Sequence, residues 1–200
     1  IKKSNIVFHF AGIAEPLKYL TNTSQVINLT VKPSLHIVDQ CCKYNKKLFF
    51  TSTSEIYGNL NKKKFKESDS RLLGPTTFSR WCYSTAKSLV EHYIIAKGNE
   101  NKLDYIIFRL FNIYGPSLKG RVVDNFVNKA LKNQNLKING NGKQTRCFLY
   151  INDCMSAFFK VFNKKISKEI FNIGQDKEIS IHNVAKKILK LTSSKSKIVL

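Results

Sequence analysis

A tyrosine and a lysine stand four positions apart in the segment Tyr83-Ser84-Thr85-Ala86-Lys87, which lies within an expected helix over residues 78–97. Residues four apart share one face of a helix. An ammonium beside a phenol stabilises the phenolate and lowers the tyrosine pKa from about 10. Such a tyrosine can take the proton of an alcohol while its carbon is oxidised. The spacing therefore predicts acid–base chemistry at this helix face.

A second group of polar side chains follows an expected strand over residues 47–53, with Thr53, Ser54 and Glu55 at its end. Parallel sheets bind ligands at the carboxyl ends of their strands. Hydroxyls also cap turns, but a carboxylate directly after them favours a functional site. Ala11 and Gly12 end another expected strand, where small residues let a ligand approach the backbone.

Expected strands and helices alternate along the chain, which predicts an α/β protein with a Rossmann-like, doubly wound parallel sheet. The strands are expected at residues 5–11, 47–53, 105–111, 136–138 and 170–173, and the helices at 24–44, 78–97, 122–131, 152–162 and 180–191. After about Leu110 the expected elements become shorter. We therefore expect residues 1–115 to form the sheet domain. Residues 116–200 should form mainly a small C-terminal substrate-binding lobe, with some elements returning to the sheet.

The composition is that of a globular chain, with 200 residues, 42% of them hydrophobic, and a formal net charge of +21. Lysines are spread along the whole sequence, which favours solvated faces over a nucleic-acid site. No apolar run reaches the ~20 residues of a membrane-spanning helix. The five cysteines form no CxxC pair, which predicts reduced thiols and a cytoplasmic protein. No metal site is expected.

Several segments, in this order, resemble the extended short-chain dehydrogenase/reductases of the NAD-dependent epimerase/dehydratase family, which modify nucleotide sugars. They are Val7–Gly12, Arg109–Pro116, Gly140–Arg146 and Phe171–Gly174, together with the Tyr-x-x-x-Lys helix. Within that family the chain is most similar to UDP-glucuronate decarboxylases. The segments that carry this similarity are Ala14–Tyr19, Thr53–Glu55, Arg80–Tyr83, Lys143–Phe148 and, as in UDP-xylose synthases, Gly120–Phe126.

The resemblance implies roles for individual residues. The catalytic residues it implies are Thr53, Glu55, Tyr83 and Lys87. The NAD-binding residues are Ala11, Gly12, Tyr83, Lys87 and Arg121, the last contacting a phosphate of cofactor or substrate. The substrate-binding residues are Ala14, Tyr19, Thr53, Ser54, Arg80, Asn112, Lys137, Lys143 and Arg146.

The reaction implied is oxidation of the sugar at C4 by NAD⁺, with Tyr83 taking the O4 proton, followed by loss of CO₂ from the β-keto acid and return of the hydride. Ser54 stands where 4,6-dehydratases of dTDP-sugars usually have Asp, and Glu55 stands where 4-epimerases usually have no acid. A 4-epimerase or a 4,6-dehydratase is the alternative. An inactive basic binding module is the alternative from another class. The presence of Thr53, Glu55, Tyr83 and Lys87 argues against it.

The family's glycine-rich G-x-x-G-x-x-G turn does not occur in these residues. We therefore expect a piece of a ~300-residue enzyme that lacks its first ~60–70 residues, and its late catalytic Arg beyond Leu200. The piece alone should bind NAD poorly. The family also implies a homodimer in which helices 24–44 and 78–97 of two subunits form a four-helix bundle. Both helices must then be apolar on an outer face as well as an inner one, and Leu89, Val90, Ile94 and Ile95 of the second helix are compatible with this.

Overall fold

The computed structural model describes residues 1–200, which divide into two compact units. Unit 1 consists of residues 1–110 and 160–173, and unit 2 consists of residues 111–159 and 174–200. The expected catalytic residues all belong to unit 1.

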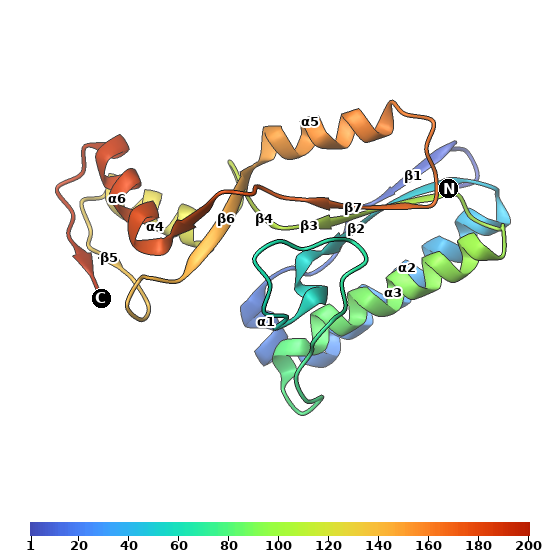
Figure 1. Ribbon diagram of the computed structural model, residues 1–200, viewed down its shortest axis with the longest axis horizontal. Coiled ribbons are helices and arrows are strands. Elements are labelled where there is room, and N and C mark those ends of the chain that lie inside the picture. Colours follow the sequence, from blue (N-terminus) through green and yellow to red (C-terminus); the bar gives the residue numbers. More distant parts are fainter. The chain divides into compact units, whose positions relative to one another are not determined.

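Unit 1 is built on a four-stranded parallel sheet in the order β1 (Ile6–His9), β2 (Lys47–Thr53), β3 (Tyr105–Leu110) and β7 (Glu169–Ile173) (Figure 1). The central strands β2 and β3 are buried along most of their length, as expected for near-continuous apolar runs between two neighbours. The prediction of an α/β fold with a Rossmann-like parallel sheet is confirmed.

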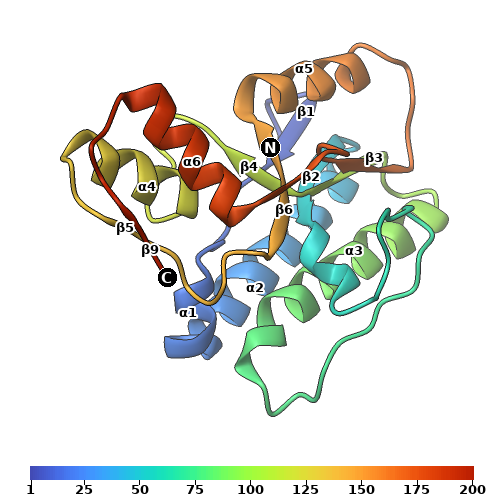
Figure 2. The ribbon, with the colours of Figure 1, turned by 60° about the vertical axis from the view of Figure 1, so that its left-hand side comes forward.

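Two helices, α2 (Thr23–Lys43) and α3 (Cys82–Asn99), run side by side along this sheet (Figures 1 and 2). Their inner faces form one core with alternate residues of the strands. This core contains Val38, Cys41, Leu48, Phe50, Val90, Ile94, Leu103, Tyr105 and Ile107. Val90 and Ile94 are fully buried there and belong to the inner apolar face of α3. Residues four apart share one helix face, and the sheet covers theirs.

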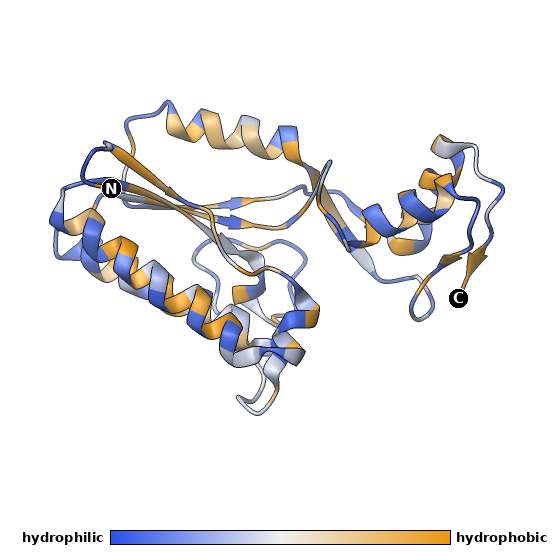
Figure 3. Cartoon of the chain, turned by 180° about the vertical axis from the view of Figure 1, so that it is seen from behind, coloured by the Kyte–Doolittle hydropathy of each residue, from blue (hydrophilic) through white to orange (hydrophobic).

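Hydrophobic residues also reach the outside of these helices, and Figure 3 shows strongly hydrophobic positions at intervals along both. Leu89 on α3 is 50% exposed, and Leu29 and Ile27 on α2 are 49% and 40% exposed. On α3, Leu89 therefore contributes to an exposed apolar face, while Val90 and Ile94 lie on the inner face.

Three short helical turns precede the longer helices or follow a strand. They are α1 (Pro16–Thr21) and the 3₁₀ turns η1 (Ser54–Tyr57) and η2 (Ser79–Trp81). Two of them, α1 and η1, lie where no helix was expected. The helix expected from residue 78 thus begins as η2, and α3 follows at Cys82. Pro16 fits the first turn of α1 because its missing N–H would have no intrahelical partner there.

The polar segment over residues 59–71 forms a loop whose two ends meet at a bridge between Gly58 and Leu72. Gly58 has φ +65°, and a Cβ there would lie 2.1 Å from the Leu72 carbonyl oxygen. Only glycine allows both this backbone conformation and this close approach. The loop therefore begins and ends at a fixed point directly after η1.

Unit 2 contains small sheets and three helices. The first sheet has the order β4 (Asn112–Tyr114), β6 (Thr145–Tyr150) and β8 (Glu178–Ser180), and the second pairs β5 (Leu136–Lys137) with β9 (Ile198–Val199). The helices are α4 (Val122–Leu131), α5 (Ile151–Phe162), whose last residues belong to unit 1, and α6 (Ile181–Thr192). The core between α4 and α6 includes Phe126, Leu136 and Ile188.

Strand β6 was not expected, although it is one of the longer strands of the chain. Its apolar residues Cys147–Tyr150 continue directly into α5 at Ile151, and no turn residue separates the two elements. A strand that passes straight into a helix gives no boundary signal in a single sequence.

Candidate active site

The end of β2 passes directly into the turn η1, and this junction positions Thr53, Ser54 and Glu55. The Thr53 hydroxyl oxygen accepts a hydrogen bond of 3.2 Å from the Glu55 backbone N–H, so Thr53 caps the turn. An accepting hydroxyl still has a proton to donate. Thr53 therefore acts as a cap and remains able to hydrogen-bond a ligand.

Glu55 forms an ion pair with Arg80, with 2.5 Å between Oε2 and Nη1. The side chains are 28% and 46% exposed, and ion pairs this exposed add little stability. The guanidinium of Arg80 also lies over the rings of Tyr19, at 5.7 Å, and Trp81, at 5.9 Å. Arg80 is thus held among a carboxylate and two aromatic rings, where it can meet a polar ligand.

Tyr83 and Lys87 are one turn apart near the start of α3, as predicted. The Tyr83 ring stacks on the Tyr19 ring, with 4.7 Å between centroids and 10° between planes. Tyr83 is 6% exposed and Tyr19 is 1% exposed. The structure therefore brings two of the expected substrate and catalytic residues, from α1 and α3, into direct contact.

Lys87 is a buried cation, with 3% of its surface exposed. Its Nζ donates to the Thr51 carbonyl oxygen at 2.7 Å and lies 4.5 Å from the centroid of the Phe50 ring. Burial lowers the Lys87 pKa to about 8, while the Glu91 carboxylate one turn further along α3 acts in the opposite direction. The ammonium is thus easier to deprotonate than an ordinary lysine.

The segment after β1 lies next to this ammonium. A Cβ added at Gly12 would be 3.6 Å from the Lys87 Nζ, which places these two predicted cofactor-binding residues side by side. Ala11 and Ala14, in the same segment, are exposed. The ends of β1 and β2 and the first turns of α3 thus gather the predicted residues of unit 1.

His9, at the end of β1, was not predicted to belong to the site. Its Nε2 is 2.7 Å from the Ser34 hydroxyl oxygen, and the ring is 5.5 Å from Phe50. Burial, and then the charge of Lys87, lower the His9 pKa to about 4, so this imidazole is neutral near pH 7. A histidine within a strand carries no signal in the sequence that could reveal such a neighbour.

The remaining predicted residues belong to unit 2. Asn112 begins β4, Arg121 immediately precedes α4, and Lys137 ends β5. Lys143 follows a turn in which Gly142 has φ +69°, and Arg146 lies in β6 with its Nη1 donating to the Thr145 carbonyl oxygen at 2.7 Å. All except Arg121 are exposed.

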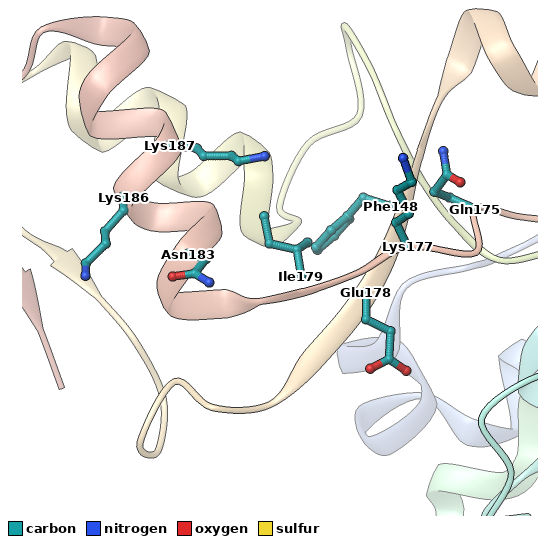
Figure 4. Close-up of a pocket in the computed structure, with 8 residues that line it drawn as sticks. All are labelled: Phe148, Gln175, Lys177, Glu178, Ile179, Asn183, Lys186 and Lys187. Atoms are coloured by element: carbon teal, nitrogen blue, oxygen red, sulfur yellow. The ribbon is translucent and has the colours of Figure 1, made fainter.

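Unit 2 also has an open cavity of about 570 Å³ beside α6 (Figure 4). Phe148 and Ile179 give it an apolar wall, and three lysines contribute positive charge. The lining residues are Phe148, Gln175, Lys177, Glu178, Ile179, Asn183, Lys186 and Lys187. None of the predicted site residues lines this cavity.

The chain contains no group of three or more His, Cys, Asp or Glu side chains that could hold a metal ion. None of its helices is both long and apolar enough to cross a bilayer.

A parallel α/β sheet with a Tyr-x-x-x-Lys helix beside its strand ends defines a class of short-chain dehydrogenase-like proteins. Residues 1–174 match the family described as the NAD dependent epimerase/dehydratase family. The chain belongs to this family.

Two curated relatives and one solved structure illustrate the similarity. The chain is 37% identical to a UDP-N-acetyl-alpha-D-glucosaminuronate decarboxylase of Bacillus cytotoxicus, over 100% of the chain and 63% of the relative. It is 34% identical to the bifunctional polymyxin resistance protein ArnA of Wigglesworthia glossinidia brevipalpis, over 98% of the chain and 32% of the relative. The crystal structure of the PbgP3 protein from Burkholderia pseudomallei superposes with a TM-score of 0.89 at 31% identity, over 99% of the chain and 66% of that structure. The chain thus spans less than two thirds of each.

Proposed function

We propose that the full-length protein is an NAD-dependent lyase that decarboxylates a UDP-hexuronate through a 4-keto sugar, with UDP-glucuronate as the first candidate substrate. The observation that carries this proposal is the grouping of Tyr83, the buried Lys87 ammonium, Thr53 and Glu55 at adjoining elements of unit 1. The similarity to a UDP-N-acetyl-alpha-D-glucosaminuronate decarboxylase supports a uronate sugar and adds its 2-acetamido form as a second candidate.

The residues of unit 1 fit the nicotinamide end of NAD. The Lys87 ammonium can donate hydrogen bonds to ribose hydroxyls. Gly12 carries no side chain that would fill the space beside this ammonium. Ala11 and Gly12 leave the backbone open to a planar ring. The residues that would hold this part of the cofactor are therefore Ala11, Gly12, Tyr83 and Lys87, with Arg121 at a phosphate. NAD, when bound, supplies the oxidation and re-reduction of the sugar carbon.

The acid–base steps belong to the residues of the chain. Tyr83 acts as the phenolate, which the Lys87 ammonium stabilises, and it accepts the proton of the O4 hydroxyl to become a neutral phenol. The Thr53 hydroxyl hydrogen-bonds O4 and aligns it. A ketone at C4 accepts the electron pair of the C5–carboxylate bond as CO₂ leaves. C5 then takes up a proton that comes from water, and Glu55 relays it.

We assign recognition of the remaining substrate to two sets of residues. In unit 1 these are Ala14, Tyr19, Ser54 and Arg80, which lie around the stacked tyrosines and Glu55. In unit 2 they are Asn112, Lys137, Lys143 and Arg146. A guanidinium fork suits the diphosphate oxygens, which supports Arg146 for that role. Unit 2 is accordingly proposed as the main part of a substrate-binding lobe.

A 4-epimerase acting on a neutral nucleotide sugar is the second candidate, because Tyr83 and Lys87 serve that reaction equally well. Glu55 favours decarboxylation over epimerisation. After decarboxylation a proton must be transferred to C5, which is a task for a carboxyl group. Simple epimerisation at C4 has no such proton transfer to carbon. Ser54 disfavours a 4,6-dehydratase of dTDP-sugars, which usually has Asp at that position, whereas Thr53-Ser54-Glu55 is compatible with dehydratases of the GDP-mannose type.

We also propose that the protein is a cytoplasmic homodimer. The five cysteines are free thiols, which is typical of a reducing compartment. Leu89, Leu29 and Ile27 expose apolar surface on the adjacent helices α2 and α3. A second copy covering these helices would remove that surface from water.

The experiment that tests the function is incubation of the full-length protein and NAD⁺ with UDP-glucuronate, with its 2-acetamido analogue and with UDP-glucose. Mass spectrometry of the products then identifies the reaction. We expect a uronate to lose the mass of CO₂ in the wild-type reaction and to remain unchanged with Tyr83→Phe. Epimerised or dehydrated UDP-glucose with intact uronates would replace the proposal by the second candidate.

A further inference from the structure

Three polar residues lie in one row across the sheet of unit 1, near the carboxyl ends of its strands. Ser52 of β2 is in register with Arg109 of β3, and Arg109 is in register with Asn172 of β7. In-register residues of parallel strands project from the same face of a sheet. For Arg109 this is the face covered by α3, because its guanidinium meets Glu91 of that helix.

Arg109 and Glu91 form a buried ion pair. The Nη2 of Arg109 donates to Glu91 Oε2 at 2.7 Å, and its Nε lies 3.2 Å from both carboxylate oxygens. Their residues are only 7% and 4% exposed. Burying two charges is favourable only with good geometry and satisfied hydrogen bonds. Glu91 takes the Nε and Nη2 of Arg109, so the buried Nη1 needs other partners.

The other partners of Arg109 are Tyr57, at the end of η1, and the loop that follows it. Nη1 donates to the Tyr57 hydroxyl oxygen and to the Glu67 carbonyl oxygen, both at 2.8 Å. The Tyr57 hydroxyl in turn donates to Asn172 Oδ1 at 2.8 Å. Tyr57 is 1% exposed, and the centroid of its ring is 5.2 Å from the Arg109 guanidinium carbon and 4.8 Å from the centroid of the Phe65 ring, on which it stacks.

Asn172 fixes the same loop from the neighbouring strand. Its backbone N–H donates to Glu67 Oε1 at 2.8 Å, and its side-chain amide donates to the Phe65 carbonyl oxygen at 3.1 Å. Two adjacent strands therefore hold both the end of η1 and the loop after it through a single tyrosine hydroxyl and a few backbone groups.

We propose that Tyr57, held by Arg109 and Asn172, is a positioning residue that fixes the turn carrying Glu55 for its proton transfer to the sugar carbon. This inference rests on the proposed decarboxylation. The turn η1 has four residues, too few to be stable on its own. Thr53 caps its start, and Tyr57 anchors its end. Arg80, the partner of the Glu55 side chain, is itself 46% exposed and cannot fix the backbone.

The test is Tyr57→Phe in the full-length protein. Phenylalanine keeps the ring beside Arg109 and Phe65 and removes only the hydroxyl that joins Arg109 to Asn172. Tyr93→Phe is the matched control, because the Tyr93 hydroxyl donates to Asp39 at 2.5 Å on the same unit, in an exposed pair of α3 and α2. Arg109→Lys is a second variant that keeps the charge and loses the fork geometry.

Two readouts are needed, one of them independent of activity. The first is hydrogen–deuterium exchange of the peptides covering residues 54–73. Tyr57→Phe should speed their exchange roughly two- to tenfold or more, because the variant loses both hydrogen bonds of the hydroxyl, with unchanged exchange in α2. Tyr93→Phe should leave residues 54–73 unchanged. Equal exchange in Tyr57→Phe and wild type would overturn the proposal.

The second readout separates the two chemical stages in a single turnover, following NADH absorbance and CO₂ release. Tyr57→Phe should slow CO₂ release by about tenfold or more relative to NADH formation, since small misplacements of a catalytic group cost this much, and Arg109→Lys should do the same. Equal slowing of both stages would overturn the positioning role and leave a purely structural one. If wild-type protein reacts with no sugar nucleotide, the proposed function fails, and the exchange experiment still decides whether the hydroxyl fixes the turn.

Discussion

Lys87 holds a positive charge where little water reaches it, and this arrangement underlies its proposed role beside Tyr83. Its Nζ has the Thr51 carbonyl oxygen and the face of Phe50 as neighbours. The fall of its pKa from 10.5 to about 8 corresponds to a cost of about 3 kcal/mol for the buried charge. Groups whose pKa is shifted this far by burial are concentrated at functional sites, where the charge stabilises a reacting group.

The Lys87 pKa predicts the alkaline limb of the activity. Above about pH 8 the ammonium loses its proton and no longer stabilises the Tyr83 phenolate, so kcat/KM should fall as pH rises through this value. His9, with a pKa of about 4, stays neutral across this range. The measurement is the pH profile of the full-length enzyme. A profile that stays flat to pH 10 would contradict the assignment.

The same shift predicts the behaviour of Lys87→Met. Between about pH 8 and pH 10.5 the unfolded chain binds more protons at Lys87 than the folded chain, so the native state gains stability as pH rises there. Methionine removes this dependence and the cost of the buried charge. We expect activity to fall by about 10²-fold or more with no loss of melting temperature at pH 7. A variant that unfolds at a much lower temperature would show a mainly structural role.

Glu55 is predicted to act after the oxidation of the sugar. Glu55→Gln keeps the size of the side chain and can still accept a hydrogen bond from Arg80, but it has no acidic proton. NADH formation in a single turnover should therefore continue, while CO₂ release or product formation slows by about 10²-fold. Loss of both signals to the same extent would assign Glu55 to binding.

At the scale of elements, the sheet and its two long helices carry unit 1. The sequence was sufficient to predict β2 and α4 to the residue, because each is bounded by polar or turn residues. It was also sufficient to predict that Tyr83 and Lys87 share a helix face. Spacing could not reveal the Glu55–Arg80 pair or the stack of Tyr19 on Tyr83, since these contacts join separate elements. Strand β6 was not predicted because it continues into α5 without a turn residue to mark the boundary.

Ile107 provides a test of this element core. It lies in β3 between β2 and β7 and is fully buried. Ile107→Ala should lower the free energy of unfolding by about 2–5 kcal/mol, through lost burial and the cavity left behind. Leu191→Ala, at a position that is 84% exposed, serves as the control and should change it by less than about 0.5 kcal/mol. Urea unfolding of both variants gives the comparison.

At the scale of the whole molecule, net charge and exposed apolar surface determine which ligands and which copies of the chain the protein attracts. A net charge of +21 attracts anionic ligands such as sugar nucleotides and keeps copies of the chain apart by repulsion. A stable homodimer must therefore rest on buried apolar area, and Leu89, Leu29 and Ile27 on α2 and α3 are the proposed source.

Leu89→Asp is the corresponding prediction. A carboxylate at the centre of an apolar dimer contact would lose its hydration, so the equilibrium should shift from dimer to monomer by about tenfold or more in dissociation constant. Sedimentation velocity of the full-length protein measures this shift, and Leu191→Asp is the control. An unchanged sedimentation coefficient would place the subunit contact elsewhere or show that none exists.

The most direct test of the central claim is the release of labelled CO₂ from UDP-glucuronate, or its 2-acetamido analogue, labelled at C6. The account predicts labelled CO₂ with wild-type protein and NAD⁺, none with Tyr83→Phe, and a strongly reduced amount with Glu55→Gln. Release of labelled CO₂ by Tyr83→Phe at the wild-type rate would contradict the assigned site. Complete retention of the label by an otherwise active wild-type enzyme would contradict decarboxylation itself.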